Sequence, residues 1–399
     1  ETFANQNFRN YAALQVFHSI GLWSQRLGEL WMVYQVTGSG VSLGFATALR
    51  TIPSLCMSPL AGVLADRYDR RRLLQISHFI KILLTAIFWA VTTHSDPGTA
   101  TLYGLILLLG VITTFDAPIR RGFVRVIVPA SLLTKAASLH TAVISVGRIL
   151  GPAIGGILIS LFDTPACFLA NTTCALLGFL LLYRIKPMEI KGKTSSTESI
   201  TFRAAASYTW RSEQIRVPLF YLGITCITIL NIEVILPILV EERLGGGSTT
   251  FSMLLVFFSL GSLLGSLGAA EQQRPGVAFH NILFGLSLAA VLLSYAPNTL
   301  LVLLGLILLG FLSGVFLGRA NARVQADVAP EFHGRVVAIY AMIFVGMRSI
   351  GSLFVGTLAQ IYSAPWALRI SAVLNIVLVA IVAGRLRFSR RINAKPLES

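Results

Sequence analysis

Charged residues are scarce in this sequence, and acidic residues are the scarcest of them. Asp, Glu, Lys and Arg make up 12% of the 399 residues, with 17 acidic against 32 basic side chains, whereas 55% of the residues are hydrophobic. The mean hydropathy is +0.75. So little charge does not cover the surface of a water-soluble globule of this length. The composition therefore excludes a soluble globular protein and predicts an integral membrane protein.

Motifs for other kinds of chemistry are missing too. The four cysteines lie in apolar stretches, with neither a disulfide framework nor a zinc-ligand spacing: Cys56, Cys167, Cys174 and Cys226. The sequence has no Gly-x-x-x-x-Gly-Lys-Ser/Thr phosphate loop, no metal-ligand cluster and no nucleophile-and-base arrangement. We therefore expect a protein that is not an enzyme and that binds no metal or cofactor.

Long apolar runs recur along the whole chain. Twelve of them approach or exceed the roughly 20 residues that cross a bilayer, at 10–36, 42–65, 73–94, 99–119, 136–161, 165–185, 217–240, 249–270, 277–296, 299–319, 335–362 and 366–385. The first run carries Arg26 and Glu29 and has no small-residue cleavage site, so we expect it to remain in the mature chain. The pattern predicts an all-α membrane protein with twelve transmembrane helices and no extra domain.

The net charge of +15 is concentrated in alternate connections between these runs. We place Arg67–Arg72, Arg120, Arg121, Arg125 and Lys135, the basic residues from Arg184 to Arg216, Arg319, Arg323 and Arg335, and the C-terminal segment on one side. Connections on the other side lack Lys and Arg, apart from Arg243. Positive charge marks the cytoplasmic side, so both termini are predicted to be cytoplasmic. No aromatic-interleaved basic groove accompanies the charge, so nucleic acid is not an expected partner.

The chain divides into two halves joined by a polar segment. We predict an N-terminal half at 1–185, a cytoplasmic linker with an interfacial helix at 186–216, and a C-terminal half at 217–399. Traces of an internal repeat support this division. A shift of 200 residues aligns Arg148 with Arg348, Gly151 with Gly351 and Gly156 with Gly356, and a shift of 204 aligns Glu29 with Glu233.

One charged hairpin is more specific than any of these patterns. From Gly62 the chain reads Gly-Val-Leu-Ala-Asp-Arg-Tyr-Asp-Arg-Arg-Arg, between two apolar runs. It resembles the loop between helices two and three of the major facilitator superfamily, Gly-x-Leu-x-Asp-Arg-x-Gly-Arg-Arg, except that Asp69 replaces the usual glycine. The matching residues are Gly62, Leu64, Asp66, Arg67, Arg70 and Arg71. The resemblance implies two parallel six-helix pseudo-repeats with substrate bound near the membrane midplane.

A second motif lies in the fifth run. The segment Gly-Arg-Ile-Leu-Gly-Pro-Ala-Ile-Gly-Gly resembles the helix-five motif of exporters that work as antiporters, and its key residues are Gly147, Gly151, Pro152, Gly155 and Gly156. Glycines at this spacing leave a flat face for a neighbouring helix, and the proline bends its own helix. Ordinary small-residue packing is the alternative reading. Phrases along the chain, such as Tyr34-Gln-Val-Thr-Gly-Ser, resemble the branch of enterobactin-exporter-like proteins and macrolide or multidrug efflux pumps.

Ionisable residues within a membrane span are costly, so each is a functional candidate. Glu29 lies in the first span three residues after Arg26. The two either neutralise each other as a structural ion pair, or Glu29 takes up protons as conformational change separates them. Glu233, near Asn231, is the symmetry-related candidate in helix seven. Glu29 and Glu233 are our proton-coupling candidates, and Asn231 is a candidate cavity residue.

Several arginines also fall within the runs. If Arg26, Arg50, Arg148 and Arg348 face the cavity that the resemblance implies, they favour an anionic substrate. If they face packed neighbours near helix ends, they snorkel or cap carbonyls and carry no information about substrate. We expect His18, Lys81, His140 and Arg369 to serve interfaces or packing.

The resemblance also implies a cytoplasmic gate. In the family the motif's aspartate lies near the N-terminus of helix eleven, which here begins near Gly334, and the helix dipole favours an anion there. Asp66 is thus expected to latch the two halves, held by Arg70 and Arg125, with Gly62, Arg67 and Arg71 completing the gate. The second-half counterpart near Glu271 has largely lost the motif, so the latch is expected to be asymmetric.

These observations predict a secondary active exporter that uses the proton gradient and proton-coupled alternating access. Its partners would be a small amphiphilic substrate, with an anion such as a siderophore-like metabolite favoured, together with protons and the lipid bilayer. A multidrug efflux pump for lipophilic drugs is the alternative, and a lipid flippase or an importer on the same fold remains open. We expect a monomer in the bacterial cytoplasmic (inner) membrane.

Overall fold

The computed structural model describes residues 6–94, 97–128, 133–185, 202–271, 279–326, 328–329 and 331–393. Within these ranges every regular element is helical. The chain forms two compact units. The first comprises residues 1–199, 236–241 and 245–256, and the second comprises 200–235, 242–244 and 257–399. The half boundaries that the sequence predicts stay a prediction, and residues 186–201 of the proposed linker lie outside the described residues.

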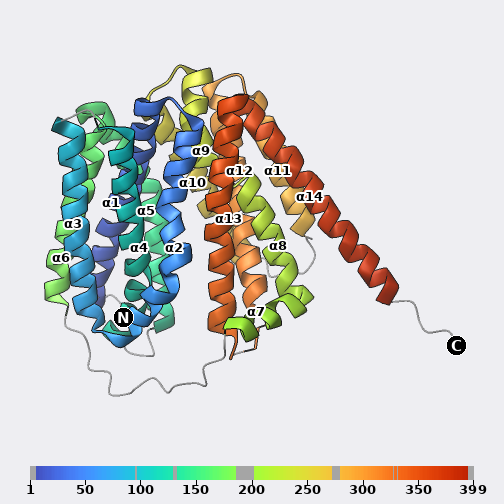
Figure 1. The fold of residues 1–399 in the computed structure, drawn as a ribbon, viewed down its shortest axis with the longest axis horizontal. Coiled ribbons are helices and arrows are strands. Elements are labelled where there is room, and N and C mark those ends of the chain that lie inside the picture. Colours follow the sequence, from blue (N-terminus) through green and yellow to red (C-terminus); the bar gives the residue numbers. More distant parts are fainter. Residues whose placement is uncertain are drawn as a thin grey trace. The chain divides into compact units, whose positions relative to one another are not determined.

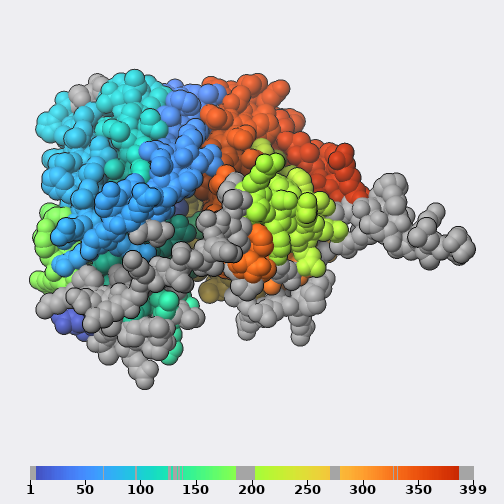
Figure 2. Space-filling view, turned by 60° about the horizontal axis from the view of Figure 1, so that its bottom comes forward, coloured from blue at the N-terminus to red at the C-terminus, as the bar shows by residue number. Residues whose placement is uncertain are grey.

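Six long helices build most of the first unit (Figure 1). They are α1 (Gln6–Thr37), α2 (Gly40–Arg67), α3 (Arg70–His94), α4 (Thr99–Ile127), α5 (Leu133–Phe162) and α6 (Pro165–Arg184). Helix α1 packs against α5 and α6, whereas α4 packs against α2 and α3. On the face shown in Figure 2, α2 and α3 form a continuous part of the surface. Their many exposed Leu, Ile, Val and Phe side chains are what a lipid-facing surface requires.

The second unit begins with a short helix, α7 (Phe202–Arg211), in the region where the sequence predicts an interfacial helix. It continues with α8 (Glu213–Thr228), α11 (Phe279–Tyr295), α12 (Thr299–Ala326), α13 (His333–Ile361) and α14 (Ala364–Asn393). Helix α8 packs against α12, α13 and α14, and α11 packs against α12 and α14. Residues of α9 (Ile232–Leu239), the π-helix Val240–Leu244 and α10 (Ser248–Glu271) are shared between the two units.

Ten helical segments are long and apolar enough to cross a membrane, among the residues that the structure describes. The remaining two of the twelve predicted spans correspond to α11, which is apolar but has 17 residues, and α1, which is long but more polar than the others. The polarity of α1 comes from buried Gln, Ser and Glu side chains. The protein is therefore a multi-pass, all-α membrane protein, as predicted.

The seventh predicted span is interrupted, which the apolar pattern did not reveal. Helix α8 ends at Thr228, a turn follows, and α9 begins at Ile232. At the break, the side-chain amide of Asn231 donates a 2.6 Å hydrogen bond to the carbonyl of Cys226. Asparagine side chains compete with the backbone for such partners, so Asn231 satisfies a carbonyl that the break would otherwise leave without its helical donor. The break leaves Glu233 in the first turn of α9, where the helix dipole favours a carboxylate.

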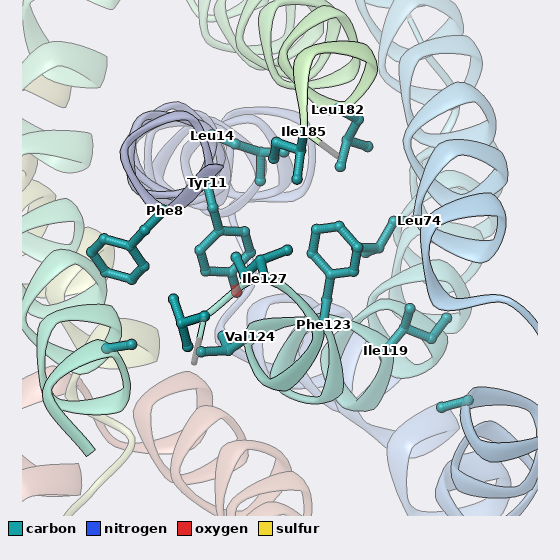
Figure 3. Close-up of a cluster of buried hydrophobic side chains, with 13 residues drawn as sticks. Phe8, Tyr11, Leu14, Leu74, Ile119, Phe123, Val124, Ile127, Leu182 and Ile185 are labelled. Atoms are coloured by element: carbon teal, nitrogen blue, oxygen red, sulfur yellow. The ribbon is translucent and has the colours of Figure 1, made fainter. Parts of the chain in front are cut away.

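An apolar cluster lies where the first part of α1 meets the last part of α4 (Figure 3). Tyr11 of α1 lies against Phe123 of α4, with ring centroids 5.9 Å apart, and Phe8 and Leu14 lie on either side of Tyr11. Leu74 of α3 and the α6 end complete the cluster, and these side chains are almost fully buried. The cluster fixes α1, α3, α4 and α6 together at one end of the first unit.

The two units repeat the same helix contacts at small residues. Gly110 of α4 packs against the carbonyl of Arg50, and Gly310 of α12, 200 positions later, packs against the carbonyl of Phe258. Gly147 of α5 faces Ser19 of α1. At the positions shifted by 200 and 204 residues, Met347 of α13 faces Gly223 of α8. The glycine of this contact lies on α5 in the first unit and on α8 in the second.

Candidate functional site

Glu29 lies in the last third of α1 with only 1% of its side chain exposed. Its Oε1 accepts hydrogen bonds from Arg50 of α2 and from the side-chain amide of Gln25, the latter at 2.7 Å. Its Oε2 lies 3.7 Å from Nη1 of Arg26 and accepts no hydrogen bond from any described residue. The three charges sum to +1, because one carboxylate meets two guanidinium groups. This is a buried charge cluster with an acceptor oxygen still available for a proton.

A second layer of polar side chains orients this carboxylate. Asn171 of α6 donates from its side-chain amide to Oε1 of Gln25, and Gln25 in turn donates to Glu29. Arg26 donates at 3.0 Å to the hydroxyl of Thr47 on α2. Helices α1, α2 and α6 are therefore all connected to the Glu29 carboxylate. Neither Gln25 nor Asn171 was among the predicted site residues, since neither carries a charge.

The second unit holds a carboxylate–arginine pair at Glu233, whose arginine comes from α13 and aligns with Arg148 rather than with Arg50. Arg348 of α13 donates to Oε1 of Glu233. Their side chains are 26% and 15% exposed, so this pair is more accessible than the one at Glu29. Gly351 lies one turn after Arg348, and its missing side chain leaves room for the α8–α9 break at Asn231. The candidates Glu233, Asn231 and Arg348 thus lie around the break between α8 and α9.

Asn375 of α14 extends the correspondence between the units. It lies 204 positions after Asn171 and is fully buried. Its amide donates a 2.8 Å hydrogen bond to Thr228 at the end of α8, and its Oδ1 accepts one from Ser287 of α11 at 3.1 Å. Asn171 of α6 thus binds α1, the helix that carries Glu29. Asn375 of α14 binds α8, the helix that precedes the one that carries Glu233.

The structure separates Arg148 from the Glu29 cluster. Its guanidinium lies over the ring of Trp23, 5.2 Å from the ring centroid, in a cation–π arrangement between α5 and α1. Arg26, Arg50 and Glu29 come together, whereas Arg148 contacts α1 at Trp23, six positions before Glu29. Arg369, which the sequence assigns to packing, lies over Tyr295 and Trp366.

The glycines of the helix-five motif form a seam with α1. Gly147 faces Ser19, Gly151 faces Trp23 and the backbone of Ser24, and Gly155 faces Leu27, all at distances that leave no room for a methyl group without movement. Gly156 faces a different neighbour, Ser252 of α10, within the first unit. The Ser252 hydroxyl donates a 2.5 Å hydrogen bond to the carbonyl of Pro152. This contact fastens α10 to α5 at its proline.

The charged hairpin connects α2 and α3 through only Tyr68 and Asp69. Asp69 accepts a 2.8 Å hydrogen bond from the backbone N–H of Arg72 through its side chain, which is the contact of an N-terminal helix cap. The aspartate in place of the family's glycine therefore starts α3.

Among the gate candidates, Arg70 donates to the carbonyls of Ala65 at 3.1 Å and Gly122 at 3.0 Å, and so ties the hairpin to α4. Arg71 donates to the carbonyl of Tyr183, Arg67 is exposed, and the face of Gly62 is open. The side chains of Asp66 and Arg125 lie outside the described residues, so their predicted contacts stay predictions.

Sequence reasoning missed a second buried charge cluster. Asp116 and Arg120 of α4 form an ion pair with both side chains 6% exposed. The prediction that Arg120 lies in a cytoplasmic connection is wrong, because α4 continues to Ile127 and buries that turn. Nearby, Nζ of Lys81 on α3 lies 2.9 Å from Nδ1 of His18 on α1. The spacing of Asp116 and Arg120 by four residues was the available signal, since such residues face each other on a helix.

Comparison with known proteins gives a consistent assignment. The model of the family described as "Transmembrane secretion effector" matches residues 1–398. The chain is 24% identical over 351 residues to a staphyloferrin A transporter of Staphylococcus aureus (strain NCTC 8325 / PS 47), covering 86% of this chain and 87% of that protein. It is 24% identical over 345 residues to the multidrug efflux pump Tap of Mycolicibacterium fortuitum, covering 83% of each chain. It is 20% identical over 378 residues to macrolide efflux protein A of Streptococcus pyogenes, covering 93% of each chain.

Solved structures share the fold at lower identity. A bacterial homolog of the human lysosomal transporter Spinster, in an inward-facing and unoccupied conformation, has a TM-score of 0.75 at 13% identity and covers 95% of each chain. The nucleoside transporter NupG has a TM-score of 0.71 at 16% identity, covering 95% of this chain and 98% of its own. The activity of this protein is therefore transport across a membrane, not catalysis of a reaction. The chain belongs to the transmembrane secretion effector family of the major facilitator superfamily.

Proposed function

We propose that this protein is a proton-coupled exporter of a small amphiphilic molecule. The observation that carries the proposal is a carboxylate–arginine contact in each unit, Glu29 with Arg50 and Glu233 with Arg348. The two glutamates align at the shift of 204 residues, while their arginines come from α2 and from α13. A structural ion pair is rarely worth its desolvation cost in a low-dielectric interior. Two such pairs, one in each unit, suit groups whose charge changes during the transport cycle.

In this proposal the proton and the arginine compete for the same carboxylate. When Glu29 binds a proton, it loses the charge that holds Arg50 and Arg26, so α2 can move relative to α1. When the proton leaves, the contacts re-form. Exchange of a proton for an arginine at Glu29, and likewise at Glu233, would link proton movement to the alternation between inward-open and outward-open states. The helix-five seam, in which glycines bring α5 against α1, would provide a surface that can shift as the contacts change.

The local charge supports an anionic substrate. With Glu29 ionised, the cluster of Glu29, Arg26 and Arg50 still has a net charge of +1, and Arg148 adds a further positive charge on the α1–α5 seam. Positive charge in a partly desolvated site attracts carboxylates. The resemblance to a staphyloferrin A transporter over 86% of the chain favours a siderophore-like metabolite.

A multidrug efflux pump for lipophilic drugs is the second candidate. The matches to a multidrug efflux pump and to a macrolide efflux protein favour it. Aromatic side chains follow Glu29 on α1, where Trp31 stacks on Phe251 with ring centroids 5.8 Å apart and also approaches Tyr34. A lipid flippase or an importer remains a further alternative on the same fold.

We also propose the setting in which the exporter works. The positively charged connections support a position in the bacterial cytoplasmic membrane with both termini in the cytoplasm. We expect a monomer, because residues of a single chain form both carboxylate–arginine pairs.

Transport in proteoliposomes under an imposed pH gradient tests the proposal. Vesicles with an acidic lumen and the exporter's cytoplasmic side outward should accumulate a carboxylate-type siderophore, and collapse of the gradient with a protonophore should stop accumulation. A macrolide in a parallel series tests the drug alternative. Accumulation only with the opposite gradient would identify an importer, and gradient-independent equilibration of labelled lipid would identify a scramblase. Either result would overturn the proposed exporter.

A further inference from the structure

The side chains around Lys81 form a second ionisable cluster within the first unit. Lys81 of α3 is 6% exposed, and its ammonium group lies 2.9 Å from Nδ1 of His18 on α1. Among the described residues, the hydrogen-bond partner of the Lys81 ammonium group is the His18 imidazole. On its other side, Nε2 of His18 lies 3.9 Å from Oδ2 of Asp116 on α4. Lys81, His18 and Asp116 therefore form a row that joins three helices.

With Lys81 protonated, the charges of Lys81, Asp116 and Arg120 sum to +1. Arg120 already neutralises Asp116 through two guanidinium nitrogens, and its third nitrogen donates at 3.0 Å to Oε1 of Gln15. Asp116 also accepts a hydrogen bond from Ser77 at 3.2 Å. A charged Lys81 therefore adds an ammonium that has no carboxylate of its own among the described residues. A buried charge without its own counter-ion costs several kcal/mol, so we expect its proton to be exchangeable.

We propose that Lys81 and His18 form a proton-binding site, separate from Glu29, that holds one exchangeable proton. A lysine ammonium donates and cannot accept, so Nδ1 of His18 is the acceptor and Nε2 carries the ring proton. The Nε2 proton leaves to water while the Lys81 proton moves to Nδ1. Lys81 becomes a neutral amine, and His18 remains neutral and now donates from Nδ1 to Lys81. One proton is released, and the hydrogen bond between the two residues persists with its direction reversed.

His18 is the group through which this proton would pass. Its side chain is 14% exposed, whereas Lys81 lies behind it. Loss of the proton lowers the total charge of Lys81, Asp116 and Arg120 from +1 to zero, which is the favourable direction in an apolar interior. The groups that face the site from the surrounding helices are Tyr11 and Gln15 of α1, Arg50 of α2, Ser77 and His78 of α3, Asp116 and Arg120 of α4, His140 of α5 and Cys174 of α6.

Helices α3 and α4 connect the site to the charged hairpin. Arg120 lies two residues before Gly122, whose carbonyl holds Arg70 at the start of α3, and Lys81 lies further along the same α3. His18 and Glu29 are eleven positions apart on α1, which corresponds to about 16 Å along the helix axis. The two proton sites are therefore distinct. All residues of the new site lie within the first unit. Only its role in coupling proton movement to transport rests on the proposed function.

Lysine- and histidine-selective NMR of the purified full chain in detergent tests this site without any transport measurement. The chain has six lysines and six histidines, so few signals need assignment, and Lys81→Arg identifies the Lys81 signal. Over about pH 5 to 9, the Lys81 and His18 signals should change with shared midpoints, as coupled groups do. His18→Gln keeps a hydrogen-bond acceptor but removes the titrating ring. It should move the Lys81 midpoint by at least about half a pH unit.

Two matched controls complete the experiment. The exposed Lys135 should show the same midpoint in the wild type and in His18→Gln, and Glu241→Gln, at an exposed position, should leave the Lys81 midpoint in place. A Lys81 signal that stays constant over this range, or a Lys81 midpoint that His18→Gln leaves unchanged, overturns the site. Shared titration in a protein whose transport ignores the pH gradient would retain this site and refute the proposed function.

Discussion

Gln25 donates a 2.7 Å hydrogen bond to Oε1 of Glu29, one turn further along α1. The same Gln25 accepts a hydrogen bond from Asn171, so a helix distant in sequence fixes the orientation of the Glu29 carboxylate. Buried hydrogen bonds that link several side chains hold these side chains in place. The chemistry at Glu29 therefore depends on uncharged neighbours as well as on Arg26 and Arg50.

Replacement of Asn171 tests that dependence. In Asn171→Ala, Gln25 loses its donor and can turn away from Glu29. Loss of one partner in a buried network costs about 1–3 kcal/mol, so we expect a lower midpoint of thermal unfolding and several-fold slower proton-driven transport. Thr173→Ala is the matched control, since Thr173 lies on the same helix, is exposed and bonds only within its own helix. Equal behaviour of the two variants would show that Asn171 does not support Glu29.

The glycine seam between α5 and α1 gives a second prediction. In Gly151→Ala the new methyl group meets Trp23 and the Ser24 backbone, so α5 must move away from α1. Overpacking of this kind costs about 1–3 kcal/mol. Gly104→Ala on α4 is the control, because nothing lies within 4 Å of the added atom. Fluorescence-monitored thermal unfolding in detergent should show a lower midpoint for Gly151→Ala only, and unchanged stability of that variant would count against a close seam.

The sign of the substrate charge gives a third prediction. Charged hydrogen bonds are worth about 1.5–3 kcal/mol each, so Arg50→Ala and Arg148→Ala should each weaken binding of an anionic substrate by roughly ten- to a hundredfold. Binding of a neutral analogue should change much less. Arg121→Ala is the control, because Arg121 is exposed and bonds to its own helix. Preference for lipophilic cations, with both arginine variants unaffected, would favour the multidrug alternative.

The hairpin gives a fourth prediction. Arg70 donates to a carbonyl of α2 and to a carbonyl of α4, and so links these two helices. The side chain of Arg67 is exposed. Arg70→Met removes both contacts while keeping much of the side-chain length. We expect it to reduce transport at least several-fold, and Arg67→Met to retain near wild-type rates. Labelling of a single cysteine placed in an outer connection would report the distribution of states, and identical labelling of both variants would argue against a gating role.

Much of this architecture is readable from the sequence because a bilayer imposes it. The twelve apolar runs reflect the length that crosses a membrane, and the Arg-rich hairpin at Arg67–Arg72 reflects the exclusion of charge from hydrocarbon. Glu29 stands out for the same reason, and its approach to Arg26 follows from their spacing on one helix.

The partners of these residues are harder to predict, because they depend on which helices pack together. Arg50 reaches Glu29 only because α2 lies beside α1 at that level. Lys81, His18 and Asp116 come from three helices, and no spacing within any one of them predicts their contact. The break at Asn231 is hidden as well, because the apolar run continues through it and a side chain replaces the missing backbone hydrogen bond.

The central claim is that a proton at Glu29 drives transport. Glu29→Gln tests it most directly, because glutamine keeps the shape and the contact with Gln25 but cannot bind the proton. Glu241→Gln, at an exposed position, is the matched control. In proteoliposomes with an imposed pH gradient, the wild type and Glu241→Gln should accumulate substrate, while Glu29→Gln should fold normally and show no gradient-driven accumulation. Proton-driven transport at the wild-type rate in Glu29→Gln would contradict the claim.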